Sequence, residues 1–278
     1  MQKWVLLFGL ISLLSLSVIA QEGSIQTEKL PFESPTEQEF WKKGISENDQ
    51  LSLLMAVRPS GEEPLAKWEE FLAKLDQKFE KKGKSLAFLR YAFQTSHQKL
   101  FKKYEQHATF NQMLSEGKFD CVSGTAVLGL LLNRYGFDHE IIETDYHVFS
   151  IVKLEEKPII LESTLKVGGM ITRPSEVKNY LNAYKPEESA TYLSLNQRIG
   201  SLDIDYSDKT IFRSINLREL AGLQYYNDAI FHFNRQAYRI SEQQLVKAYQ
   251  LYPSERIDGL RELTIDQAYK TLGIDLRK

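Results

Sequence analysis

The sequence predicts an α+β protein with one buried helix, an antiparallel sheet after it, and helical regions before and after these elements. Three observations support that class. An apolar run from Ala126 to Leu132 has the composition of a buried helix. Short segments rich in Ile, Val and Phe follow it between residues 140 and 163, as in an antiparallel sheet. The flanking regions instead carry apolar residues at three- and four-residue spacing, which is typical of amphipathic helices.

The first twenty residues predict the compartment. Lys3 supplies a positive charge, residues 5–19 are almost wholly apolar, and Val18-Ile19-Ala20 offers small residues before Gln21. This pattern is typical of a secretory signal peptide spanning residues 1–20. A retained anchor helix is the alternative, but a membrane span usually needs ~20 apolar residues. We therefore expect an exported protein, periplasmic or secreted, without a membrane span once the signal is cleaved.

A leader and a series of helices come next. Residues 21–35 are mostly polar and are expected to form a flexible leader. Ser34-Pro35-Thr36-Glu37 combines an N-cap, a first-turn proline and the spacing of a capping box, so a helix begins there. Apolar spacing then predicts further helical segments: residues 51–57, which continue the first helix or begin a second, residues 62–82, and residues 85 to about 107.

Three strands are expected after the buried helix, at residues 140–143, 147–154 and 158–163. The middle strand should alternate between two faces, with Val148, Ser150, Val152 and Leu154 on one and His147, Phe149, Ile151 and Lys153 on the other. Gly168-Gly169 indicates a turn. Residues 174–216 are mixed in character and predict no clear order of elements.

The turn between the last two strands decides which residues meet across them. If Glu155-Glu156 is a two-residue turn, His147 lies opposite Thr164, and Glu162 is its diagonal neighbour on the same face. Diagonal neighbours are about 7–8 Å apart at Cα, within reach of a glutamate bonding an imidazole. A four-residue loop would move Glu162 out of range, and Ser163 would face the wrong way.

The chain from residue 216 to residue 278 is expected to be helical. Its residues Tyr225, Ala229, His232, Ser241, Leu245, Ala248 and Pro253 fit a single tetratricopeptide-like helix pair. An ordinary helical hairpin is an equally good interpretation. Since one unit cannot bury its faces alone, it should pack on the main domain, residues 36–215, and it offers a surface for a protein partner.

Cys121 is the only cysteine of the chain, and it stands at the start of the buried helix. The helix dipole and the unpaired N–H groups there favour a thiolate. His147 and Glu162 follow on strand-like segments, so the chain holds a thiol nucleophile, a base and an orienting acid. A lone cysteine beside an apolar helix is more often a small buried hydrophobe. An unpaired thiol in an exported protein is a liability unless it is buried or used, which modestly favours use.

Composition and motifs exclude several function classes. The chain is 42% hydrophobic and 26% charged with a net charge of −2, which loss of Lys3 would change to −3. A net charge this close to zero does not indicate nucleic acid or anionic lipid partners. No phosphate-binding loop, dinucleotide glycine fingerprint or zinc-ligand spacing is present, so we expect neither cofactor nor metal. His107 and His139 are interpreted as surface residues, and Asp120 either caps the helix or opposes the thiolate by like charge.

These blocks together resemble bacterial transglutaminase-like proteins over roughly residues 85–172. The matching segments are Gly117-x-Phe-Asp-Cys-Val-Ser-Gly-Thr-Ala126, Tyr135-Gly-Phe137, His147-Val-Phe149, and Glu162-Ser-Thr164 followed by Gly168-Gly169. The resemblance implies a papain-like core in which Cys121 is the nucleophile, His147 the base and Glu162 the acid, where many members have aspartate. By analogy, the Cys121 N–H would serve as an oxyanion-hole donor.

The sequence thus favours an exported thiol hydrolase or acyltransferase that acts on an amide bond of a peptide or protein through an acyl-enzyme. A peptidoglycan-peptide amidase would differ from this only in substrate. The alternative from another class is a catalytically inactive scaffold that keeps the core and binds a protein partner through its helical regions.

Overall fold

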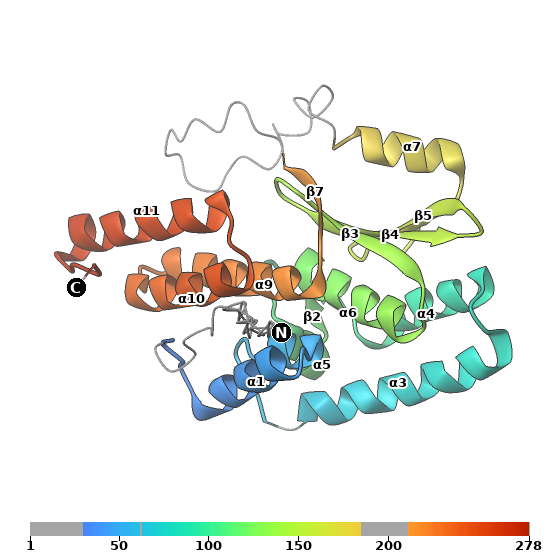
Figure 1. The fold of residues 1–278 in the computed structure, drawn as a ribbon, viewed down its shortest axis with the longest axis horizontal. Coiled ribbons are helices and arrows are strands. Elements are labelled where there is room, and N and C mark those ends of the chain that lie inside the picture. Colours follow the sequence, from blue (N-terminus) through green and yellow to red (C-terminus); the bar gives the residue numbers. More distant parts are fainter. Residues whose placement is uncertain (1–29, 62, 185–210, 278) are drawn as a thin grey trace, which may run out of the picture.

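The computed structural model describes residues 30–61, 63–184 and 211–277. It confirms the α+β class: an antiparallel sheet has helix α7 on one face and α6 on the other, and further helices surround this core (Figure 1). The predicted signal peptide and most of the predicted leader lie outside the described residues. The last part of the leader belongs to the fold, because Leu30 and Phe32 pack against the main core and Phe32 meets the Trp41 ring edge-on.

In the described part of the chain, five helices precede the nucleophile segment: α1 (Pro35–Ser46), α2 (Gln50–Met55), α3 (Glu63–Lys82), α4 (Leu86–Lys99) and α5 (Phe110–Glu116). Ser34 caps α1 as predicted, accepting the Glu37 N–H at 3.1 Å. The Glu37 carboxylate accepts the N–H of Glu33, one residue before the position that a capping box requires. Asp49 caps α2, so residues 51–55 belong to a second helix, which ends at Met55, two residues before the predicted end.

The predicted helix from residue 85 to about 107 is wrong in its second half, because α4 ends at Lys99. The N–H groups of Lys102 and Lys103 both donate to the Gly117 carbonyl at 3.0 Å. The chain then forms β1 (Lys103–Tyr104), which pairs in parallel with β2 (Lys118–Phe119). These long-range bonds replace further helical bonds, and they bring Tyr104 beside the segment that leads into Cys121.

The sheet has the strand order β6-β5-β4-β3-β7. Its strands are β3 (Asp138–Thr144), β4 (Val148–Leu154), β5 (Lys157–Leu161), β6 (Met170–Ile171) and β7 (Phe212–Ile215). The predicted register is confirmed: Leu154 pairs with Lys157 and Ser150 with Leu161 across the Glu155-Glu156 turn. Strand β7 and helix α7 (Pro174–Asn182) come from the region that the sequence pattern left unordered.

The alternation along β4 separates two cores. Val148 and Val152 belong to the main core with α6 (Cys121–Arg134), whereas Phe149 packs in a smaller core with Val177 of α7. The sheet is therefore covered on both faces, as its almost continuous apolar strands require. One end of this sandwich carries the start of α6, the start of β4 and the end of β5.

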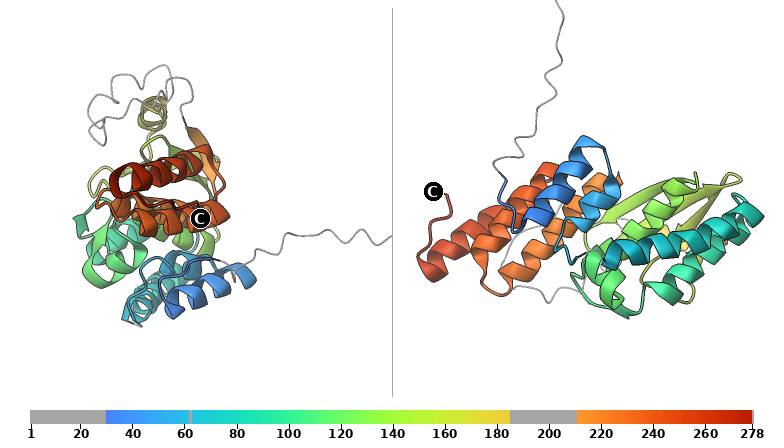
Figure 2. Two further views of the ribbon diagram at one scale, coloured as in Figure 1. Left: turned by 90° about the vertical axis from the view of Figure 1, so that its left-hand side faces the viewer. Right: turned by 90° about the horizontal axis from the view of Figure 1, so that it is seen from below.

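Three helices follow β7: α9 (Leu217–Phe233), α10 (Tyr238–Leu251) and α11 (Glu255–Leu272). Helix α9 packs on α6 and α2, so the C-terminal region shares the main core, as predicted (Figure 2). Helices α9 and α10 pack closely, and Ser241 Oγ donates to the Ala229 carbonyl at 2.9 Å. A tetratricopeptide relation of this hairpin stays a prediction.

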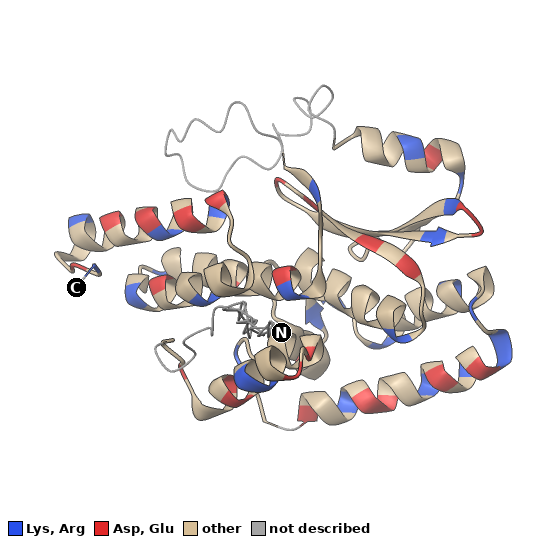
Figure 3. Ribbon diagram, viewed as in Figure 1, with Lys and Arg blue, Asp and Glu red and all other residues tan. Residues whose placement is uncertain are grey.

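Acidic and basic residues are interspersed along α3 and α11 (Figure 3). None of the described helices combines the length and the apolar character that crossing a membrane requires.

Candidate active site

Cys121 is the first residue of α6 and is half-buried. The helix starts here because Asp120 caps it: the Asp120 carboxylate accepts the Ser123 N–H at 2.7 Å, and Ser123 Oγ accepts the Asp120 N–H at 2.9 Å. Asn227 of α9 donates to the other Asp120 oxygen at 3.0 Å. Burial raises the pKa of Asp120, against the hydrogen bonds from Ser123 and Asn227. Of the two roles expected for Asp120, the structure contains the cap.

The Cys121 N–H remains outside this cap. Asp120 engages the N–H groups of Val122 and Ser123, and Gly124 donates to the Asp120 carbonyl at 3.0 Å. In the described part of the chain, no hydrogen bond engages the Cys121 amide. An N–H at the first turn of a helix, next to the sulfur, is suited to hold a developing oxyanion.

His147 directly precedes β4, and a tight connection from β3 fixes its backbone. The Thr144 N–H donates to the His147 carbonyl at 2.8 Å, and the His147 N–H donates to Thr144 Oγ1 at 3.1 Å. The imidazole ring lies nearly parallel to the ring of Tyr184, with centroids 6.1 Å apart. This packing leaves the ring edges, where the nitrogens lie, to meet polar partners.

Glu162 follows β5 and is 2% exposed. Its Oε2 lies 2.5 Å from His147 Nε2, so the predicted contact across the strands is confirmed. The same oxygen accepts a short hydrogen bond from the Tyr180 hydroxyl of α7. Its Oε1 accepts the Thr164 N–H at 2.8 Å and the Thr164 hydroxyl at 2.6 Å. The carboxylate thus has four donors, which favours the ionised form.

The electrostatics of the three groups are mutually consistent. Burial alone would lower the pKa of His147, but hydrogen bonding and charge from Cys121 and Glu162 raise it well above 6.5. Burial would likewise raise the pKa of Glu162, yet the bonds from His147, Thr164 and Tyr180 hold it below its usual value. With Nε2 at Glu162, Nδ1 is the ring nitrogen left to face the thiol. The raised pKa of His147 and the lowered pKa of Glu162 favour an imidazolium paired with a carboxylate.

Sequence reasoning missed Tyr180, Thr164 and Tyr104. Tyr180 lay in the unordered region, although Pro174 and the spacing of Val177, Tyr180 and Tyr184 together indicate a helix that begins at residue 174. Desolvation raises the pKa of Tyr104 although the residue is 52% exposed, and charge at Cys121, Asp120 and Glu162 raises it further, so this residue lies beside the site. No local pattern signalled Tyr104, because the β1–β2 pairing brings it there.

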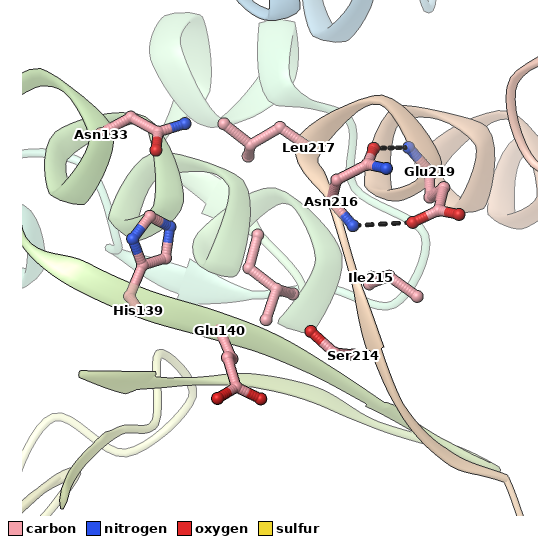
Figure 4. Close-up of a pocket in the computed structure, with 9 residues that line it drawn as sticks. Asn133, His139, Glu140, Ser214, Ile215, Asn216, Leu217 and Glu219 are labelled. Atoms are coloured by element: carbon pink, nitrogen blue, oxygen red, sulfur yellow. Dashed lines mark hydrogen bonds between the residues drawn. The ribbon is translucent and has the colours of Figure 1, made fainter. Parts of the chain in front are cut away.

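The remaining predicted features lie elsewhere. His139 and His107 are half-buried rather than surface residues, and His139 Nδ1 lies 3.0 Å from the Phe137 carbonyl oxygen. His139 lines a cavity of about 400 Å³ between the end of α6, β3 and the start of α9 (Figure 4). Cys121 lies at the opposite end of α6, so this cavity is separate from the site.

Within residues 30–61, 63–184 and 211–277, no group of three His, Cys, Asp or Glu side chains could hold a metal ion. Comparison with known proteins finds no matching family model, no matching curated protein and no matching solved structure. Cys121, His147 and Glu162 are therefore the residues from which a function can be inferred.

Proposed function

We propose that this protein is an exported thiol enzyme, a hydrolase or acyltransferase, that acts on an amide bond through Cys121, His147 and Glu162. The observation that carries the proposal is the pairing of His147 with Glu162 at the end of the sheet where Cys121 begins α6. His147 Nε2 lies 2.5 Å from Glu162 Oε2, and hydrogen bonding and charge from Cys121 and Glu162 raise the pKa of His147. Nucleophile, base and orienting acid thereby stand in the order that covalent catalysis needs.

The arrangement of the elements supports a papain-like, transglutaminase-like core for residues 36–215. The nucleophile begins a buried helix, and this helix packs on an antiparallel sheet. The histidine precedes one central strand and the acid follows its neighbour. Such folds host proteases, amidases, crosslinking enzymes and inactive scaffolds, so the proposal rests on the site and not on the fold.

In the proposed reaction the Cys121 thiolate attacks the amide carbonyl carbon, forming a C–S bond and an oxyanion, which the Cys121 N–H is placed to stabilise. The C–N bond then breaks, and the His147 imidazolium gives its proton to the departing amine. This leaves an acyl-enzyme and a neutral imidazole. Water or an acceptor amine next adds to the acyl carbon and yields its proton to His147, and release of the product restores the thiolate–imidazolium pair.

The first experiment measures alkylation of Cys121 by iodoacetamide as a function of pH. Because the chain has one cysteine, labelling reports that site alone. We expect the folded protein to react faster at pH 6 than both the urea-unfolded protein and the His147→Ala variant, since the imidazolium stabilises the thiolate. Reactivity equal to that of the unfolded chain, or independent of His147, would instead support the inactive scaffold.

A second experiment addresses substrate and compartment. A library of peptides, including peptidoglycan peptides, is incubated with wild type and with Cys121→Ala, with water or an amine as acceptor. Products formed only by wild type identify the bond and distinguish hydrolysis from transfer, and the absence of any would leave the scaffold. N-terminal sequencing of exported protein should begin near Gln21, whereas material that still contains Lys3 contradicts cleavage.

A further inference from the structure

We propose that Tyr180 is a positioning residue of this site: its hydroxyl keeps Glu162 ionised and aimed at His147, so that helix α7 is part of the catalytic apparatus. This inference rests on the function proposed above. Tyr180 does not face the reacting sulfur through any described bond, and it acts through Glu162.

The first argument is the geometry of the carboxylate. Glu162 Oε1 is held by its own loop, through the N–H and hydroxyl of Thr164. Glu162 Oε2 receives only two donors in the described structure, His147 Nε2 and the Tyr180 hydroxyl. Because the His147 ring alternates between a charged and a neutral form during the reaction, the strength of its bond to Oε2 changes, whereas Tyr180 donates to Oε2 from a neutral hydroxyl throughout. The Tyr180 hydroxyl therefore fixes the position of Oε2, the oxygen that must accept a hydrogen bond from the imidazole.

The second argument is how α7 presents the hydroxyl. Val177 is buried against the sheet face that carries Phe149 and Ile160, which seats the helix opposite α6 (Figure 1). The Tyr180 ring meets the Phe149 ring edge-on, with centroids 5.0 Å apart and an interplanar angle of 90°. These apolar contacts lock the ring, so the hydroxyl reaches Glu162 from a separate element.

The third argument is that few other groups around Glu162 change charge. From α4, His97 is buried, and burial together with the Lys166 ammonium lowers its pKa to about 4, against the attraction of Glu162. Burial raises the pKa of Tyr104 on β1 and of Tyr180 on α7, so both stay neutral. Tyr184 adds its hydroxyl 3.5 Å from that of Tyr180. Glu162, His147 and Cys121 therefore carry the charge changes of the site.

The direction of the expected effect follows. A hydrogen bond to the ionised carboxylate lowers its pKa, so loss of the Tyr180 hydroxyl raises the pKa of Glu162. On acidification Glu162 is then protonated earlier, the imidazolium loses its anionic partner, and the thiolate fraction of Cys121 falls. The acid limb of Cys121 reactivity should move to higher pH in Tyr180→Phe.

The test compares iodoacetamide alkylation of the mature protein between about pH 4 and pH 9 in wild type, Tyr180→Phe and Tyr135→Phe. Tyr135→Phe is the matched control, because Tyr135 donates a similar bond, at 2.8 Å, to the carboxylate of Asp76 away from the site. We expect Tyr180→Phe to shift the acid limb upward by about one pH unit, and Tyr135→Phe to leave it in place. At a pH on the wild-type acid limb, this shift corresponds to roughly tenfold slower labelling.

A second measurement keeps the test independent of alkylation. NMR titration followed at the His147 ring, whose Nε2 lies 2.5 Å from Glu162, should record the protonation of Glu162 at higher pH in Tyr180→Phe than in wild type. Replacement of Tyr180 by 3-fluorotyrosine, a more acidic donor of similar size, should move the acid limb of alkylation toward lower pH. This variant serves as the test if Tyr180→Phe does not fold.

The outcomes separate the two proposals. Wild-type reactivity that depends on His147, with an unchanged acid limb and unchanged His147 titration after the Tyr180 replacements, overturns the role of Tyr180 alone. Wild-type reactivity that does not depend on His147 overturns the proposed function itself.

Discussion

At the scale of single residues, the charge state of the site depends on a carboxylate that is almost completely withdrawn from water. An isolated buried carboxylate would take up a proton. Glu162 instead meets four donors from three separate segments of the chain, at His147, Thr164 and Tyr180. Its ionised form therefore depends on the tertiary structure, and so does its ability to stabilise an imidazolium.

Replacing Glu162 by Gln tests this dependence. The amide keeps the volume but cannot stabilise the imidazolium charge, so we expect turnover to fall while the fold is retained. The corresponding change in a serine triad lowers kcat about 10⁴-fold, and a thiol enzyme should lose less, between about 10- and 1,000-fold, because its thiolate is already partly formed. Glu140→Gln is the control, since Glu140 is a partly exposed glutamate of β3 that pairs with Lys153. Unchanged turnover and labelling in Glu162→Gln would remove this residue from the site.

At the scale of elements, two tight features bring the three residues together. The turn between β4 and β5 sets the register that aligns His147 with Glu162, and Glu155 and Glu156 adopt φ values of 51° and 60° there. The close approach of α6 to the end of β5 fixes the position of Cys121 relative to the sheet. A Cβ at Gly124 would lie 2.8 Å from the Cβ of Ser163, so glycine is needed at this point.

The turn makes a stability prediction. Two-residue hairpin turns with positive φ at both positions favour Asn-Gly, because other side chains are strained in the left-handed region. The double substitution Glu155→Asn with Glu156→Gly should therefore raise the free energy of unfolding by about 1 kcal/mol. Thermal unfolding measures this effect, and His147-dependent alkylation should be unchanged because the register is kept. A lower Tm would contradict the turn geometry.

The helix contact makes a second prediction at this scale. Gly124→Ala must push α6 away from Ser163, which should cost about 1–3 kcal/mol of stability and reduce the reactivity of Cys121. Gly259→Ala is the matched control, because Gly259 lies within α11 with no atom within 4 Å of an added Cβ. There, alanine should stabilise the helix by up to about 1 kcal/mol. Equal effects of the two substitutions would refute the close approach.

At the scale of the whole molecule, buried charges join segments far apart in the sequence. Lys247 of α10 and Glu37 of α1 are 0% and 1% exposed, and the Lys247 Nζ lies 2.5 Å from Glu37 Oε1. Tyr225 of α9 donates to the same oxygen. Near the site, the buried Glu143 of β3 accepts bonds from Arg213 and Arg256, so α11 supports the strand that leads to His147.

The pair of Lys247 and Glu37 predicts strong coupling between the two ends of the fold. Lys247→Met leaves Glu37 buried without its cation and should destabilise the protein by about 3–5 kcal/mol. Adding Glu37→Gln should recover much of that loss, because two neutral groups of similar volume need no charge partner. Urea unfolding of both single variants and the double variant measures the coupling. Additive effects in this cycle would show that the pair contributes no mutual stabilisation.

The sequence by itself determined the α+β class, the Ser34 N-cap of α1, the register across Glu155-Glu156 and the contact of His147 with Glu162. These features depend on local periodicity, on turn length and on the alternation of strand faces, which neighbouring residues set. Only the tertiary structure decided the end of α4, the placement of Tyr104, the helix that brings Tyr180 to Glu162, and the second role of Glu37 as the partner of Lys247. In each of these cases the deciding bond joins residues that are distant in sequence, and a local pattern carries no information about a partner that only folding brings near.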